Sequence, residues 1–178
     1  MQALVLAFMI SVAGVIPAAQ TITIDVPLPR RAHVEAPTQR LGVTIGRLEI
    51  PAIGVDELIR EGVSLSVIDR GVGHWAGTAK AGGYGNMVLA GHRTTKTAPF
   101  HDLDLLQPGD SITVTGFDGR TAKYSVSETV IVAPSDIWIV DQTDVPMLTL
   151  FACHPKRSAR QRIVVRAELA DLPVLHFP

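Results

Sequence analysis

Cysteine is scarce in this sequence, because Cys153 is the only one among 178 residues. An internal disulfide needs a pair of cysteines, so no disulfide links distant parts of the chain. Structural zinc is commonly held by closely spaced pairs of Cys or His, and no such spacing occurs. Asp102, Asp104 and Asp110 could bind calcium loosely, but they are equally typical of helix starts and turns. We therefore expect no metal and no cofactor, and Cys153 is either a packed core thiol or a reactive group.

Clustered basic charge is also lacking. The formal net charge is -1, and no run of Lys or Arg is longer than a pair. Proteins that bind nucleic acid usually present a concentrated basic patch, so we expect no nucleic-acid partner. The length and the 47% hydrophobic content suit one compact domain with a sizeable core.

Charged residues are absent from positions 3–19, where the apolar run is interrupted only by Ser11, Gly14 and Pro17. A helix of this length at about 1.5 Å per residue would span about 26 Å, close to the hydrocarbon thickness of a membrane. Residues 1–19 are therefore predicted to be a membrane anchor or a signal segment, and the alternative is a buried helix of a cytosolic domain. The first basic residue is Arg30. Since a basic flank is expected before an anchor, we expect the true start to lie upstream.

The remaining chain divides into a tether, one domain and a tail. Residues 20–40 contain three prolines and three arginines, which predicts a flexible tether. We expect one folded domain over 41–172 and a tail over 173–178. Apolar runs separated by turn residues predict strands at 46–51, 55–61, 86–92, 111–116, 122–132, 147–153 and 162–169. Short helical segments are predicted at 64–70, 98–106 and 135–140. Seven or eight strands with little helix predict a mainly β fold, a closed or nearly closed barrel.

Strand alternation places the thiol on a defined face. Side chains two residues apart share a face, so Thr149, Phe151 and Cys153 point away from the face of Leu148, Leu150 and Ala152. In the last strand the apolar face is formed by Ile163, Val165, Ala167 and Leu169, which sends Arg162 to the opposite face.

Pairing of these two strands would bring a cation to the thiol. If they run antiparallel through the loop 154–161, Cys153 and Arg162 lie about 5 Å apart. A guanidinium there favours thiolate and can donate to an oxyanion. His92, at the end of the run 86–92, could protonate a departing amine. Arg160 and Arg166 are rivals to Arg162, and each of the three residues could instead have a purely structural role.

Three segments sharpen this interpretation: RLEIPAIGVDELIREGV, GVGHWAGTAKAGGYGNMVLAGHRTTKTAPFHDLDLLQPGDSITV and TLFACHPKRSARQRIVVRAEL. In this order, over about residues 41–170, they resemble the sortases, the cysteine transpeptidases of the Gram-positive cell surface. The stretch CHPKRSARQR is similar to the class E branch typical of actinobacteria. One departure is Ala152, where the family usually has Thr directly before the nucleophile.

The resemblance implies an eight-stranded sortase barrel with His92, Cys153 and Arg162 as the catalytic residues. Cys153 would attack the Thr carbonyl of a C-terminal sorting signal of the form Leu-(Pro or Ala)-x-Thr-Gly. An amine of a peptidoglycan precursor or a pilin would then resolve the thioester. The predicted substrate-binding residues are Trp75, Ala90, Thr94, Thr95, Thr149, Ala152 and His154, although His154 and Trp75 could equally be structural.

The implied protein is anchored by its N-terminal segment on the outer face of the membrane of a Gram-positive, actinobacterial cell. Its partners are surface proteins with sorting signals, the amine acceptor and the membrane. Two alternatives stay open, a sorting-signal peptidase in which water resolves the thioester and a barrel that binds such peptides without catalysis.

Overall fold

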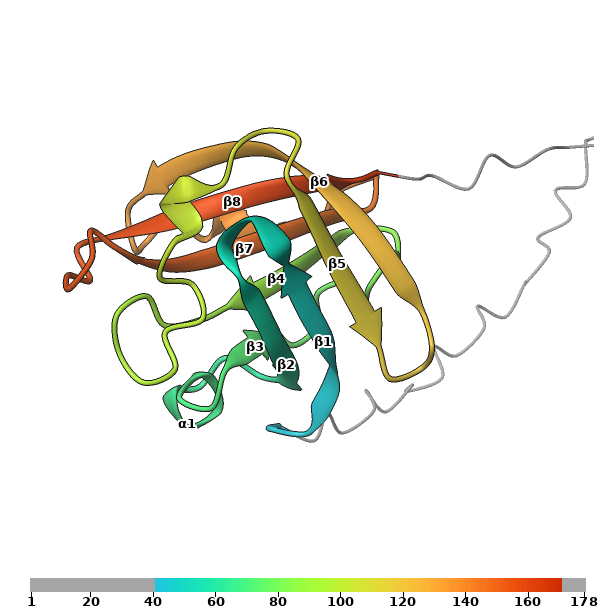
Figure 1. Ribbon diagram of the computed structural model, residues 1–178, viewed down its shortest axis with the longest axis horizontal. Coiled ribbons are helices and arrows are strands. Elements are labelled where there is room, and N and C mark those ends of the chain that lie inside the picture. Colours follow the sequence, from blue (N-terminus) through green and yellow to red (C-terminus); the bar gives the residue numbers. More distant parts are fainter. Residues whose placement is uncertain (1–40, 171–178) are drawn as a thin grey trace, which may run out of the picture. The chain divides into compact units, whose positions relative to one another are not determined.

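Residues 41–170 are described by a computed structural model, in which eight strands close into one barrel (Figure 1). The order around the barrel is β1-β2-β3-β4-β7-β8-β6-β5. The strands are β1 (Thr44–Ile50), β2 (Val55–Glu61), β3 (Val72–His74), β4 (Asn86–Ala90), β5 (Ser111–Gly116), β6 (Thr121–Val132), β7 (Met147–His154) and β8 (Gln161–Leu169). The helical pieces are α1 (Leu65–Ile68) and the 3-10 turns η1 (Pro51–Ile53), η2 (Leu103–Leu105) and η3 (Ile137–Val140). The predicted mainly β barrel with a few short helices is confirmed.

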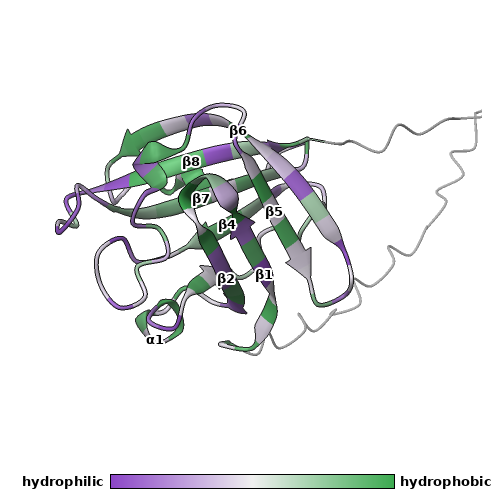
Figure 2. Cartoon of the chain, in the orientation of Figure 1, coloured by the Kyte–Doolittle hydropathy of each residue, from purple (hydrophilic) through white to green (hydrophobic). Residues whose placement is uncertain are grey.

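Alternation of apolar and polar residues builds the barrel interior. The inward positions of β7 and β8 are apolar and buried: Leu148, Leu150, Ala152, Ile163, Val165 and Ala167. They pack in one cluster with buried side chains from each of the other six strands. Tyr124 and Phe100 are among the largest fully buried side chains. Figure 2 shows the contrast between these apolar strands and the hydrophilic loop that joins β7 to β8. The interior therefore fixes which face of β7 remains outside.

Two strand pairings position the end of β7. β4 runs parallel to β7, with Ala90 opposite Phe151. β8 runs antiparallel to β7, with Cys153 opposite Arg162. The ends of these strands consequently meet at one rim of the barrel.

The strand that lacked a predicted range is β3, which has only three residues. Its middle residue is Gly73, a poor strand former, and a Cβ at this position would collide with the carbonyl oxygen of Gly62. The predicted helical segments at 64–70, 98–106 and 135–140 contain helical turns, but each turn is shorter than its predicted range.

The predicted segments 1–19, 20–40 and 173–178 lie outside the described residues. Within 41–170, none of the helices has the length and apolar character that a membrane crossing requires.

Candidate active site

Cys153 lies at the outer face of β7, one residue before the strand ends. The thiol is partly exposed, while the adjacent Ala152 points into the core. On the neighbouring strand Arg162 is its direct cross-strand partner. The Arg162 guanidinium donates to the carbonyl oxygens of Ala159 at 3.0 Å and Gln161 at 2.9 Å. These bonds hold the cation at the mouth of the β7–β8 loop.

The two rival arginines are differently placed. Arg166 lies four residues further along β8, opposite Thr149, and donates to Glu128 at 3.1 Å. Its guanidinium also lies 5.9 Å from the centre of the Trp138 ring. Arg160 is exposed in the β7–β8 loop, before β8 begins. Of the three, only Arg162 is in register with Cys153.

His92 follows β4 by two residues and extends the β4–β7 ladder. The amide of Gly91 donates to the carbonyl oxygen of Phe151 at 3.3 Å. Continuing the parallel register from Ala90 and Phe151 brings His92 level with Cys153. Alternation along the chain assigns both side chains to the outer face. The backbone positions of His92, Cys153 and Arg162 therefore lie at the same rim of the barrel.

Asp69 is a site residue that sequence reasoning missed. It caps the C-terminus of α1, and its Oδ1 accepts a hydrogen bond from His92 Nε2 at 2.8 Å. Lys96 lies 3.6 Å from the other carboxylate oxygen. The hydrogen bond from His92, and then the charge of Lys96, hold the pKa of Asp69 below its ordinary value. Because Asp69 and His92 are 23 positions apart in a loop-rich stretch, no periodicity could have indicated the contact.

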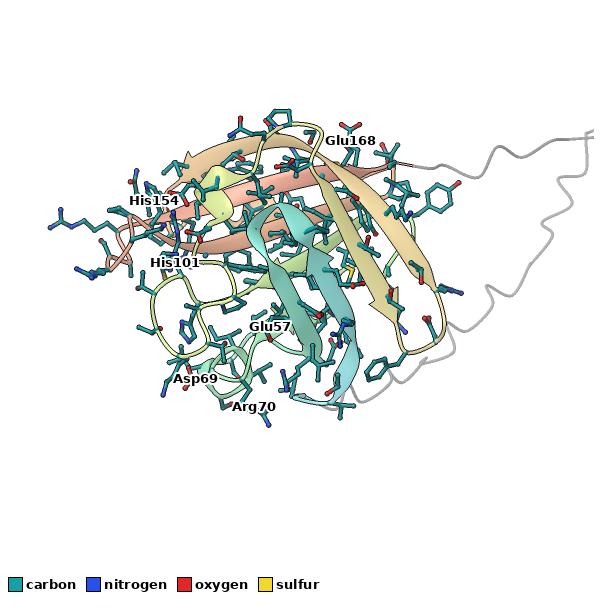
Figure 3. The ribbon with its side chains drawn as sticks, in the orientation of Figure 1. Glu57, Asp69, Arg70, His101, His154 and Glu168 are labelled. Atoms are coloured by element: carbon teal, nitrogen blue, oxygen red, sulfur yellow. The ribbon has the colours of Figure 1, made fainter. Side chains whose placement is uncertain are left out.

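Arg93 is a second unpredicted element of the site, buried to 2% exposure next to His92. Its guanidinium donates to the carbonyl oxygen of His101 at 3.1 Å and to Nδ1 of His154 at 2.8 Å. Its remaining nitrogen pairs with Asp104 at 2.9 Å. Arginine can only donate, so Nδ1 of His154 accepts and the ring proton lies on Nε2. Figure 3 shows His101 and His154 on the side where the β7–β8 loop projects.

A small apolar cluster lies on the outer face of β7 and β8. Val132, Ile139 and Val164 form a buried cluster, against which Phe151 packs. The ring of Trp75 lies 6.1 Å from that of Phe151. Phe151 immediately precedes the inward-facing Ala152, so its ring and the thiol of Cys153 lie on the same outer face of β7.

The other predicted substrate-binding residues differ in how deeply they are buried. Thr94 is half-buried and Thr95 is exposed in the loop after His92, while Ala90 is buried on the outer face of β4. Thr149 is 1% exposed and its hydroxyl donates to Asn86 Oδ1 at 2.8 Å. Ala152 faces the barrel interior. Neither Thr149 nor Ala152 is brought to the surface beside Cys153, so any influence on substrate would pass through neighbouring side chains.

Asp102, Asp104 and Asp110 each have partners within the protein. Asp102 accepts from Lys156 at 2.9 Å, Asp104 pairs with Arg93, and Asp110 accepts from the Gln107 amide at 2.8 Å. Over the described range 41–170, no group of three or more His, Cys, Asp or Glu side chains could hold a metal ion.

A closed barrel that carries a cysteine, a histidine and an arginine at one outer rim is typical of enzymes that use a cysteine nucleophile. A family model described as the sortase domain matches residues 48–170. The chain therefore belongs to the sortase family, as its three sequence segments predicted.

Known relatives agree with this assignment. Sortase SrtE1 of Streptomyces coelicolor is 32% identical over 142 residues, which cover 70% of this chain but only 40% of SrtE1. The putative sortase YwpE of Bacillus subtilis is 33% identical over 90 residues, half of this chain and 87% of that protein.

Solved structures extend the agreement to the fold. The Sortase D5 transpeptidase of Clostridium perfringens superposes with a TM-score of 0.68 at 33% identity, covering 74% of this chain and 82% of that one. Sortase E of Streptomyces avermitilis superposes with a TM-score of 0.66 at 30% identity, covering 74% and 90%.

Proposed function

We propose that this protein is a cysteine transpeptidase that cleaves a Leu-(Pro or Ala)-x-Thr-Gly sorting signal between Thr and Gly and transfers the Thr-terminated part to an amine. The observation that carries the proposal is the register of β7 and β8, which sets Arg162 opposite the partly exposed Cys153. Membership of the sortase family supports the same reaction.

In the first half of the reaction, the Cys153 thiolate attacks the Thr carbonyl carbon. The oxyanion that forms accepts hydrogen bonds from Arg162, whose guanidinium is already held at the loop mouth. The C–N bond to Gly breaks, and His92 gives its proton to the departing amine. A thioester between Thr and Cys153 remains.

In the second half, an amine attacks the thioester and the C–S bond breaks. His92 takes the proton that the amine loses, and Cys153 leaves as a thiolate. The enzyme thereby returns to its starting protonation state. Water in place of the amine would give hydrolysis.

Asp69 acts in this scheme as a positioning residue. A carboxylate only accepts, so the bond to Asp69 requires the hydrogen on Nε2 of His92. Nδ1 is then the ring nitrogen that exchanges the proton with substrate. The carboxylate also stabilises the doubly protonated ring that the first half of the reaction consumes.

Two further features belong to the proposal. The acceptor is an amine of a peptidoglycan precursor or a pilin, and the partners are surface proteins that carry sorting signals. The N-terminal segment 1–19 anchors the domain on the outer face of the membrane of a Gram-positive, actinobacterial cell, in line with the identity to a Streptomyces sortase.

Mass spectrometry of the full chain with Leu-Pro-x-Thr-Gly and Leu-Ala-x-Thr-Gly peptides tests the reaction. We expect an acyl adduct that maps to Cys153 and disappears when a glycyl amine is added, with a ligated product in its place. The Cys153→Ala variant should form no adduct. Absence of both adduct and cleaved peptide with the unmodified chain would reject the proposal, and cleavage without ligation at saturating amine would assign a peptidase.

A further inference from the structure

The side chain of Arg93 takes no part in the reaction proposed for this protein, although it follows His92 directly and is only 2% exposed. Burying a cation costs free energy unless the charge is paired and its hydrogen-bond donors are satisfied. The guanidinium of Arg93 meets both conditions, through the carboxylate of Asp104, the carbonyl oxygen of His101 and Nδ1 of His154. The burial and the three partners together fix where this side chain lies.

The bond from Arg93 to His154 joins the segments that carry the two reacting side chains. Arg93 follows His92, and His154 follows Cys153. In the described part of the chain, the last backbone hydrogen bond between these segments runs from the amide of Gly91 to a carbonyl oxygen of β7 at 3.3 Å. The next connection is the 2.8 Å bond between the side chains of Arg93 and His154. His92 and Cys153 therefore lie between a backbone link on one side and a buried side-chain link on the other.

The three acceptors lie in different directions around the guanidinium. Nε donates to His101, Nη1 donates to His154, and Nη2 pairs with Asp104. Arginine can satisfy such a set because its donors are fixed in a planar fork, whereas the ammonium of lysine is a single point charge on a flexible stem. His101 and Asp104 belong to the connection between β4 and β5, and His154 ends β7. Arg93 therefore fixes the course of the chain after His92 and attaches it to the end of β7.

Lys156 makes a second connection between the same two loops, in different surroundings. Its ammonium lies 2.9 Å from the carboxylate of Asp102, and the two side chains are 36% and 39% exposed. Exposed ion pairs contribute little, because solvent screens the charges and both side chains lose freedom. The guanidinium of Arg93 is buried, so the link through Arg93 is the one that we expect to hold the loops in register.

We propose that Arg93 is a positioning residue, which holds His92 at the distance from Cys153 that proton transfer requires by means of its hydrogen bond to His154. This inference rests on the proposed transpeptidase function and adds a residue to it. The imidazole of His92 has to reach the departing amine while the sulfur of Cys153 is bonded to the acyl carbon. A misplacement of about 1 Å in such a geometry can reduce the rate by about 10²-fold.

Acylation kinetics of the full chain test the role of Arg93. Mass spectrometry follows adduct formation on Cys153 with the Leu-Pro-x-Thr-Gly or Leu-Ala-x-Thr-Gly peptide that acylates the unmodified chain. In Arg93→Lys the rate constant at saturating peptide should fall by about tenfold or more, while the half-saturating peptide concentration stays within about twofold. Loss of folded protein alone would lower the final amount of adduct and leave the rate constant unchanged. A rate constant within about twofold of the unmodified value, or a change confined to half-saturation, would overturn the proposal.

Two variants of His154 test the same link from the β7 side, and they decide the question even if Arg93→Lys does not fold. His154→Asn keeps a hydrogen-bond acceptor near the position of Nδ1, whereas His154→Leu has none. The rate constant should stay within about threefold in His154→Asn and fall by about tenfold in His154→Leu, the size of one charge-assisted hydrogen bond. Equal losses in the two variants would overturn the proposal.

The double variant Arg93→Lys/His154→Leu measures the coupling between the two side chains. Its loss in rate constant should not exceed the larger single loss, because both changes break the same bond. Losses that multiply would mean that the two residues act independently, and the proposed link would be wrong.

Lys156→Ala is the matched control, since it breaks the exposed connection between the same loops. Its rate constant should stay within about twofold of that of the unmodified chain. A loss as large as that in Arg93→Lys would mean that any link between the loops positions His92, and the assignment to Arg93 would be rejected.

The tautomer of His154 provides a readout that needs no substrate. Nitrogen-15 NMR of the full chain, at a mildly alkaline pH where imidazole is neutral, should place the ring hydrogen on Nε2 and leave Nδ1 as the acceptor for Arg93. A hydrogen on Nδ1 would contradict the proposed link. The kinetic outcomes separate the two claims. If the unmodified chain forms no adduct, the transpeptidase function fails and the role of Arg93 fails with it, whereas equal rate constants for the unmodified chain and Arg93→Lys reject the role of Arg93 alone.

Discussion

Two histidine–carboxylate pairs in this barrel have nearly equal hydrogen-bond lengths but opposite surroundings. His92 and Asp69 are joined at 2.8 Å, with side chains that are 16% and 35% exposed. His74 and Glu61 are joined at 3.0 Å, with side chains that are 3% and 11% exposed. The second ring nitrogen of His74 is occupied by Ala79 and Thr78. For His92, no second ring partner occurs within residues 41–170.

The difference lies in what the second nitrogen can do. His74 is bonded at both nitrogens, so its ring is fixed and cannot exchange a proton with a substrate. His92 is held at Nε2 by Asp69, so Nδ1 is the nitrogen that exchanges the proton with substrate in the proposed reaction. The same pair of residue types therefore produces a structural element inside the barrel and a candidate catalytic element at its rim.

Removing the imidazole at the rim should produce the largest effect on activity. His92→Ala eliminates the proton donor and acceptor, so kcat/KM for peptide transfer should fall by about 10²- to 10⁴-fold. Thermal unfolding should change little, because His92 is partly exposed. Steady-state kinetics and circular dichroism measure the two properties.

A matched variant on the same side of the barrel is His101→Ala. His101 is exposed and pairs with Asp102, and Figure 3 shows its side chain near the projecting loop. Its activity should stay within about twofold of the unmodified chain. Equal losses in the His92 and His101 variants would contradict the role assigned to His92.

Removing the buried imidazole of His74 should have the opposite result, a loss of stability without a loss of activity. His74→Ala leaves Glu61 inside the barrel without either a proton or a hydrogen-bond donor, which typically costs about 3 kcal/mol of the free energy of unfolding. Activity per folded molecule should be retained. Denaturant unfolding and kinetics at a temperature where the variant is folded measure these quantities.

The double variant His74→Leu/Glu61→Leu measures how strongly the two side chains are coupled energetically. Removing both polar groups should destabilise the protein less than His74→Ala alone, because no unpaired acceptor remains. If the stability lost in the double variant equals the sum of the losses in His74→Leu and Glu61→Leu, the two side chains are not energetically coupled.

Weakening the hydrogen bond between His92 and Asp69 without removing the imidazole should have an intermediate effect on activity. Asp69→Asn keeps the size of the side chain but removes the charge that stabilises the doubly protonated ring of His92. We expect kcat/KM to fall by about tenfold, the size of one charge-assisted hydrogen bond. The active form needs an ionised thiol and a protonated imidazole, so the optimum of the pH–rate profile should move to lower pH.

Asp69→Glu tests whether position or charge matters. A longer carboxylate should restore the pH optimum even if some activity is lost. Lys96→Ala, which removes the neighbouring cation 3.6 Å from Asp69, should leave kcat within about twofold. An unshifted optimum in Asp69→Asn would remove Asp69 from the mechanism while leaving Cys153 and Arg162 unaffected.

The sequence was sufficient to predict the barrel and the facing of Cys153 and Arg162, because both depend on local alternation and on adjacent strands. The facing of Cys153 and Arg162 followed from a period of two residues and one connecting loop, and the structure has this register. By contrast, the contacts of Asp69 and Arg93 join segments that loops bring together, and loop paths leave no periodic signal. Thr149 and Ala152 are predicted as substrate contacts from the family resemblance, which carries no information on burial, and both residues are buried.

The smallest expected effect is on stability in acid, and it concerns the pair formed by Asp69 and His92. The pKa of Asp69 is lowered in the folded protein, first by the hydrogen bond from His92. A lowered folded-state pKa adds stability above the ordinary value of 3.8, and this contribution is lost as the pH falls through the folded value. Below about pH 5, where only carboxyl groups titrate, the difference in unfolding temperature between the unmodified chain and Asp69→Asn should therefore be small and should shrink until it vanishes in strong acid. A difference that grows as the pH falls through this acid range would mean that Asp69 destabilises the folded state when it is ionised, and its proposed role in holding His92 would have to be abandoned.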